Sequence, residues 1–215
     1  MAYPTVSAPY GLKPVNLIGG QVNAGSTRQI PIASGYATSI FNGDVVKLSS
    51  DGVLVKETGT TTATPVGVFM GVSYTDPVLK YKIFSQYYPA DTVASDIVAY
   101  VVDDPDALFK VAVVSGTTVV AGVARTVVGN NVALVQNAGD ANTGNSAVAV
   151  LSTSAATTAS LPIRIIDVVP ETVDSSGNYT EVIVKWNAPY FTLAEGAPNT
   201  ITFAGGHQYL NPLGV

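Results

Sequence analysis

Valine dominates the apolar residues of this chain, with 33 valines against 12 leucines in 215 residues. A β-branched side chain loses rotamer freedom in a helix and packs well on a pleated surface, so this composition favours strands. From Asp44 onward, short apolar runs alternate with turn residues at the spacing of about 8–12 residues that sandwiches and barrels show. We therefore predict an all-β fold, an antiparallel barrel or sandwich of about ten strands, over residues 44–188.

Glycine positions inside this region predict local geometry. Asp51-Gly52 separates the apolar runs 44–49 and 53–56 and supplies the positive φ of a tight hairpin turn. Gly67 and Gly71 interrupt a longer apolar run, where glycine indicates a bulge or a close approach of another backbone. Strand pairing is therefore expected to be irregular around these two glycines.

Both ends of the chain differ from this central region in their high content of glycine and proline. We predict an extended N-terminal arm over residues 1–43 and a C-terminal tail over residues 189–215. An arm that carries scattered apolar residues is expected to pack on a partner or along its own domain. An irregular segment folded over its own barrel stays an open alternative for residues 1–43. The candidate partner-binding residues are the apolar and aromatic residues Tyr3, Tyr10, Leu12, Val15, Leu17, Ile18, Tyr209 and Leu210.

Charge and composition exclude several classes of function. Ten Lys and Arg against fifteen Asp and Glu give a net charge of −5. Nucleic-acid phosphates are bound by positive charge, so we expect no nucleic-acid partner. No apolar run approaches the roughly 20 residues of a spanning helix, so we expect no membrane partner. The absence of cysteine excludes disulfides and thiol nucleophiles. Charged residues make up only 12%, which suggests that neighbours cover much of the surface.

Catalytic and cofactor signatures are missing from the sequence. His207 is the only histidine, and no Gly-x-Ser-x-Gly elbow is present to place a nucleophile beside it. We therefore predict a surface or interface position for His207, no enzymatic activity and no cofactor. Asp103, Asp104 and Asp106 could together hold a hard cation, but neighbouring Asp residues beside a proline more often form a turn, and we favour the turn.

Several stretches of the chain resemble small structural proteins of tailed-phage heads. The resemblance covers roughly half of the chain, within its N-terminal two-thirds, and it is carried by the order of five segments: residues 10–15, 30–38, 40–46, 64–74 and 102–111. The last two of them read Thr64-Pro65-Val66-Gly67-Val68-Phe69-Met70-Gly71-Val72-Ser73-Tyr74 and Val102-Asp103-Asp104-Pro105-Asp106-Ala107-Leu108-Phe109-Lys110-Val111.

This resemblance implies a capsid decoration, or cement, protein on the outer surface of the virion head. Such proteins are non-enzymatic, β-rich and often trimeric, and they bridge subunits of the major capsid protein through extended termini. Deleting residues 1–18 is then expected to abolish binding to expanded heads while leaving the β domain folded. Three alternatives stay open: another virion component such as a head-fibre base or tail protein, a carbohydrate-binding β-sandwich, and, with least support, a hydrolase.

Overall fold

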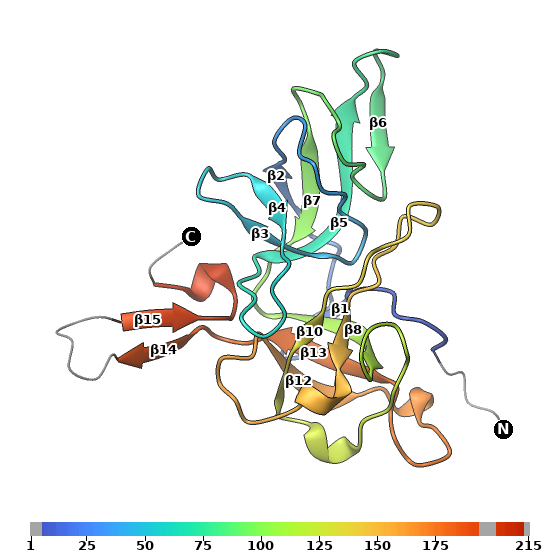
Figure 1. Cartoon of the computed structure of the whole chain (residues 1–215), viewed down its shortest axis with the longest axis vertical. Coiled ribbons are helices and arrows are strands. Elements are labelled where there is room, and N and C mark those ends of the chain that lie inside the picture. The colour runs from blue at the N-terminus through green and yellow to red at the C-terminus, as the bar shows by residue number, and fades with distance from the viewer. Residues whose placement is uncertain (1–5, 194–200, 213–215) are drawn as a thin grey trace.

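The computed structural model describes residues 6–193 and 201–212, and the chain is all-β (Figure 1). Thirteen strands form two sheets, and helix is limited in the described residues to the single 3-10 turns η1 (Arg125–Val127), η2 (Ser152–Ser154), η3 (Pro170–Thr172) and η4 (Gln208–Leu210). The prediction of an all-β fold is confirmed.

The first sheet has seven strands. They are β1 (Lys13–Leu17), β8 (Ala107–Val114), β9 (Asn131–Val132), β10 (Leu134–Val135), β11 (Ala149–Leu151), β12 (Ile163–Val168) and β13 (Glu181–Trp186). Residues 131–135 connect the two edges of this sheet. β9 pairs with β12 at one edge, and β10, which follows β9 after the single residue Ala133, pairs with β11 at the other. The sheet therefore curls back on itself into a nearly closed barrel, which hides most strand edges. Pairing is antiparallel except between β11 and β8, which are parallel.

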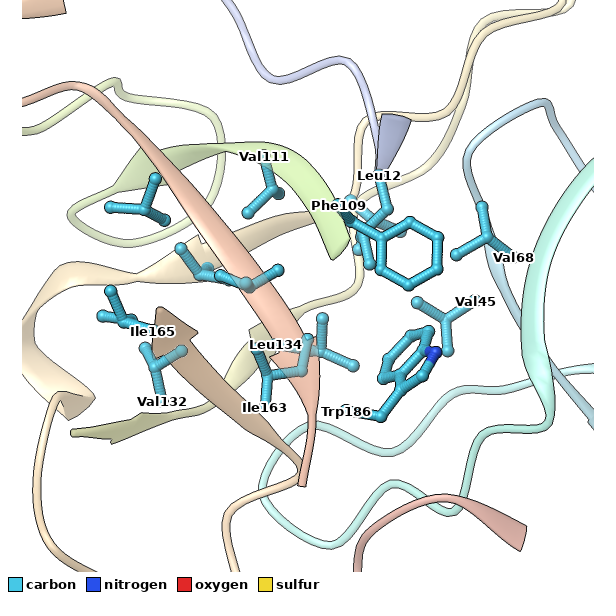
Figure 2. Close-up of a cluster of buried hydrophobic side chains, with 14 of the residues drawn as sticks. Leu12, Val45, Val68, Phe109, Val111, Val132, Leu134, Ile163, Ile165 and Trp186 are labelled. Atoms are coloured by element: carbon cyan, nitrogen blue, oxygen red, sulfur yellow. The ribbon is translucent and has the colours of Figure 1, made fainter. Parts of the chain in front are cut away.

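Alternate residues of the barrel strands fill its interior (Figure 2). Phe109 and Val111 of β8 are completely buried, as are Ile163 of β12 and Val184 of β13. The Phe109 ring lies 5.3 Å from that of Trp186, at the end of the barrel that faces the second sheet. Side chains therefore fill the barrel as a packed core.

The second sheet has six strands and its own core. They are β2 (Arg28–Pro31), β3 (Val45–Leu48), β4 (Leu54–Lys56), β5 (Gly67–Thr75), β6 (Lys82–Ser85) and β7 (Val98–Val102), and the order is β2-β7-β5-β3-β4 with β6 paired to β5. At three places two successive residues enter different cores, because successive side chains of a strand point to opposite faces. Val45, Val68 and Val102 lie in the barrel core. Their respective neighbours in the chain, Val46, Phe69 and Val101, lie in the core of the second sheet.

A buried carboxylate also joins the two sheets. Asp44 is completely buried, and its Oδ2 accepts the backbone N–H of Phe41 at 2.9 Å and pairs with Nζ of Lys56 at 2.7 Å. Its Oδ1 accepts the hydroxyl of Ser146 at 2.6 Å, in the loop that leads into β11 of the barrel. Both carboxylate oxygens are thus satisfied, as a buried charge requires.

The predicted glycine geometry is confirmed. Gly52 has a φ of 72° in the turn between β3 and β4, where the N–H of Ser49 donates to the carbonyl of Val53. A Cβ on Gly67 would lie 2.2 Å from the carbonyl oxygen of Val102, so the neighbouring strand approaches too closely for any side chain. The register of β5 against β7 shifts before Gly71, as a bulge requires.

The described N-terminal segment lies on the body of the molecule, whereas the C-terminal segment first leaves the body and then returns to it. Within residues 6–43, β1 pairs with β8 of the barrel and β2 forms an edge of the six-stranded sheet, so this segment belongs to both sheets. At the other end, β14 (Tyr190–Leu193) and β15 (Ile201–Ala204) pair with each other and project from the body (Figure 1). The chain then returns to the body through residues 205–212, called the C-terminal strap below.

Candidate interaction surface

Two glycines allow the C-terminal strap to enter the body. Gly205 and Gly206 have φ values of 63° and 77°, in the left-handed region that glycine adopts without strain. A Cβ on Gly205 would lie 2.4 Å from the carbonyl oxygen of Ser160, and one on Gly206 would lie 2.5 Å from the backbone nitrogen of Pro189. Both positions therefore require glycine, because the backbone has a positive φ and because a Cβ would clash with a neighbouring backbone atom.

The strap ties the two sheets together. His207 donates its backbone N–H to the carbonyl of Asn187, directly after β13 of the barrel, at 3.1 Å. Gln208 donates its backbone N–H to the carbonyl of Pro65, and its side chain bonds both the N–H and the carbonyl of Leu48 in the six-stranded sheet, at 2.7 and 3.1 Å. The strap is fixed in position by backbone and amide hydrogen bonds on both sides.

The side chain of His207, a residue of the strap, is completely buried, so the prediction of a surface or interface position is wrong. Its ring packs against Trp186 at 6.4 Å and edge-on against Tyr209 at 5.2 Å, and Nδ1 accepts the backbone N–H of Tyr209. Burial lowers the pKa of His207, although the nearby carboxylates of Asp103 and Asp104 act in the opposite direction. The histidine therefore serves as a neutral packing residue at ordinary pH.

Tyr209 links the strap to the turn after β7. Its hydroxyl accepts a hydrogen bond from Nη1 of Arg28 at 2.6 Å and donates to Oδ2 of Asp103 at 3.0 Å. Arg28 also lies over the tyrosine ring, 5.5 Å from its centroid. Desolvation and the bond to Asp103 raise the pKa of Tyr209 to about 12, so its hydroxyl stays a donor. These contacts hold the ring in one place while 41% of the residue remains exposed.

Ile18 and Leu210 come from opposite ends of the chain and line the same pocket. They are 44% and 46% exposed, and the pocket of about 260 Å³ between them is also lined by Ile166 and Trp186. Arg164, Lys185, Asn187 and Ala188 complete its wall. We call the surface formed by Ile18, Ile166, Trp186 and Leu210 around this pocket the terminal face. Two of the eight predicted partner-binding residues, Ile18 and Leu210, are therefore together on one surface.

A second hollow lies beside the terminal face. Leu17, Val22 and Val102 line it together with the carboxylates of Asp103 and Asp104, and its volume is about 160 Å³. The bridge between Asn16 and Val22 folds this part of the N-terminal segment against β1. We call this hollow, which Ala24, Asn23 and Ser26 also border, the acidic groove.

The other predicted residues of the N-terminal segment do not join these surfaces. Leu12 is completely buried in the barrel core, so its prediction as a partner contact is wrong. Tyr10 donates its hydroxyl to buried Glu181 of β13, and desolvation followed by this bond raises the tyrosine pKa strongly. Val15 is 40% exposed on β1, and Tyr3 lies outside the described residues.

The carboxylates of Asp103, Asp104 and Asp106 have separate partners. Asp103 bonds Tyr209, Asp104 accepts the backbone N–H of Asp106 at 2.8 Å, and Asp106 pairs with Lys185 at 2.6 Å. The preferred interpretation of this cluster as a turn is confirmed. Within residues 6–193 and 201–212, no group of three or more acidic or histidine side chains is arranged to hold a metal ion.

The hairpin of β5 and β6 carries a surface that the sequence analysis missed. Four large apolar residues are exposed within seven positions of the chain: Val78 (83%), Leu79 (60%), Tyr81 (54%) and Phe84 (72%). The hairpin points away from the barrel (Figure 1). The available signal was the Val-Leu pair directly after Asp76-Pro77, because an apolar pair in such a turn has no strand partner to cover it.

Comparison of the chain with protein-family models, with curated protein sequences and with solved structures finds no match. None of the helical turns in the described part of the chain is long and apolar enough to cross a membrane. The geometry of the exposed surfaces therefore carries the functional argument, together with the resemblance noted in the sequence.

Proposed function

We propose that this protein is a non-enzymatic structural component of a phage virion, which decorates the outer surface of the head and cements it by bridging subunits of the major capsid protein. The terminal face is the observation that carries this proposal. It presents apolar side chains from both ends of the chain around one pocket, and anchored neighbours hold it in place.

A rigid apolar surface suits a cementing role. Ile18 and Leu210 need little ordering on binding, because the residues beside them are fixed by the strap and by β1, so less conformational entropy is lost. Apolar anchors around a pocket, bordered here by Arg164 and Lys185, have the arrangement of an interface core with a polar rim. Many copies that each cover two shell subunits would add contact area against the pressure of packaged DNA.

Binding to heads that lack the protein tests the proposal. We expect the wild-type protein to saturate expanded heads in a sedimentation assay, and Leu210→Asp and Ile18→Asp each to weaken binding about tenfold or more, because a carboxylate would be buried without a partner. Val119→Asp is the matched control, since Val119 is 65% exposed on the barrel and away from the terminal face. Wild-type affinity in both terminal-face variants would contradict the proposal.

Position in the particle separates this function from the nearest alternative. A head-fibre base or a tail protein would use an apolar face in the same way, but it would occupy one vertex or the tail. Immunogold labelling of intact virions should mark the whole head surface for a decoration protein. Labelling confined to one site would replace the proposed function with the alternative.

A further inference from the structure

The tip of the β5–β6 hairpin is a rigid apolar projection. Oδ1 of Asp76 accepts the backbone N–H groups of Val78 and Leu79, each at 2.7 Å. The N–H of Lys80 donates to the carbonyl of Asp76, and the N–H of Asp76 to the carbonyl of Tyr81. The tip is therefore held in one conformation although it extends into solvent, and rigidity of this kind lowers the entropic cost of binding.

The acidic groove complements this tip in apolar character and in charge. Val78 and Val22 are the two most exposed large apolar residues described, at 83% and 77%, and one lies on the tip and the other in the groove. Lys80 on the tip has no ion-pair partner among the described residues, and neither does Asp104 in the groove. An apolar projection beside a lysine without an ion pair thus matches an apolar hollow beside a carboxylate without an ion pair, among the described residues.

We propose that the tip of one copy inserts into the acidic groove of a second copy. Val78 and Leu79 enter between Leu17, Val22 and Val102, and Lys80 pairs with Asp104. The occupant of the groove is therefore another molecule of this chain. The contact joins two different surfaces, so it is heterologous, and repeating it produces a ring when the rotation closes.

A contact of this size is weak when it forms alone. A standard interface covers about 800 Å² on each partner, which is more than one hairpin tip offers. Association should therefore depend on concentration in solution and become strong where copies are held side by side. The apolar insertion supplies most of the affinity, and the Lys80–Asp104 pair fixes the register of the two copies.

Sedimentation velocity of the purified full-length chain over about 10 μM to 1 mM tests the proposal. We expect the wild-type protein to shift from monomer to a discrete oligomer in this range. Val78→Asp should raise the concentration needed about tenfold or more. Val119→Asp, a comparably exposed valine on the barrel, should leave it unchanged.

A double-mutant cycle tests the charge pair without disturbing the turn. Lys80→Gln and Asp104→Asn remove the charges, and the asparagine keeps the oxygen that accepts the N–H of Asp106. Each single variant should weaken association, and the double variant should be no weaker than either single one. Additive losses, a monomer at every concentration, or association that Val78→Asp leaves intact would each overturn the proposal. This assay uses the free protein, so its result is independent of binding to heads.

Discussion

The barrel and the six-stranded sheet are built from similar valine-rich strands but differ in how completely they bury their apolar residues. The barrel closes on itself through residues 131–135 and buries the aromatic rings of Phe109 and Trp186. The six-stranded sheet remains open, and its β5–β6 end exposes Phe84 and Val78 to solvent. Closure therefore hides the strand edges and apolar residues of the barrel, whereas the open sheet leaves apolar residues exposed at its β5–β6 end.

Deletion of residues 1–18 should have the largest effect, because this segment is part of the barrel. It removes β1, buried Leu12 and the bond from Tyr10 to Glu181, so we expect loss of the cooperative unfolding transition in circular dichroism. The sequence led us to expect that the β domain stays folded after this deletion; from the structure we now expect it to unfold. Leu12→Ala in the full chain should cost about 2–5 kcal/mol in the free energy of unfolding, and Val15→Ala much less. Wild-type stability of the truncated protein would contradict the conclusion that β1 is part of the barrel.

A matched pair of phenylalanines measures the difference between the two regions. Phe109→Ala leaves a cavity in the barrel core and should lower the free energy of unfolding by about 3–5 kcal/mol. Phe84→Ala removes a ring that is 72% exposed and should change it by about 0.5 kcal/mol or less. Urea denaturation of both variants gives the two values. Equal losses would mean that the open end of the sheet is covered in the free protein.

The buried histidine should give a smaller effect that depends on pH. Because the pKa of His207 is lower in the folded protein than its ordinary value of 6.5, the unfolded chain binds the proton more readily. Stability is therefore complete above about pH 6.5 and falls as the pH drops through the window between 6.5 and the lowered pKa. His207 is the only histidine, so comparing urea unfolding of the wild type and His207→Asn at about pH 7 and 5 isolates its contribution. An unchanged pH dependence in the variant would contradict this account.

Local features could be predicted from the sequence, whereas features set by distant contacts could not. The turn at Gly52 and the close approach at Gly67 follow from the residues themselves. Leu12 and Ile18 look equally apolar in the sequence, but pairing with β8 shifts register between Pro14 and Leu17, which changes the face that later residues occupy. Burial of His207 likewise depends on contacts of the strap with both sheets, and no local sequence pattern predicts these contacts.

Imaging of intact particles by cryo-electron microscopy is the most direct test of the proposal that this protein cements a phage head. We expect copies across the outer head surface, with Ile18 and Leu210 against the major capsid protein and the β5–β6 tip directed at a neighbouring copy. Heads without this protein on their surface, or copies whose terminal face is turned to solvent, would contradict the proposal.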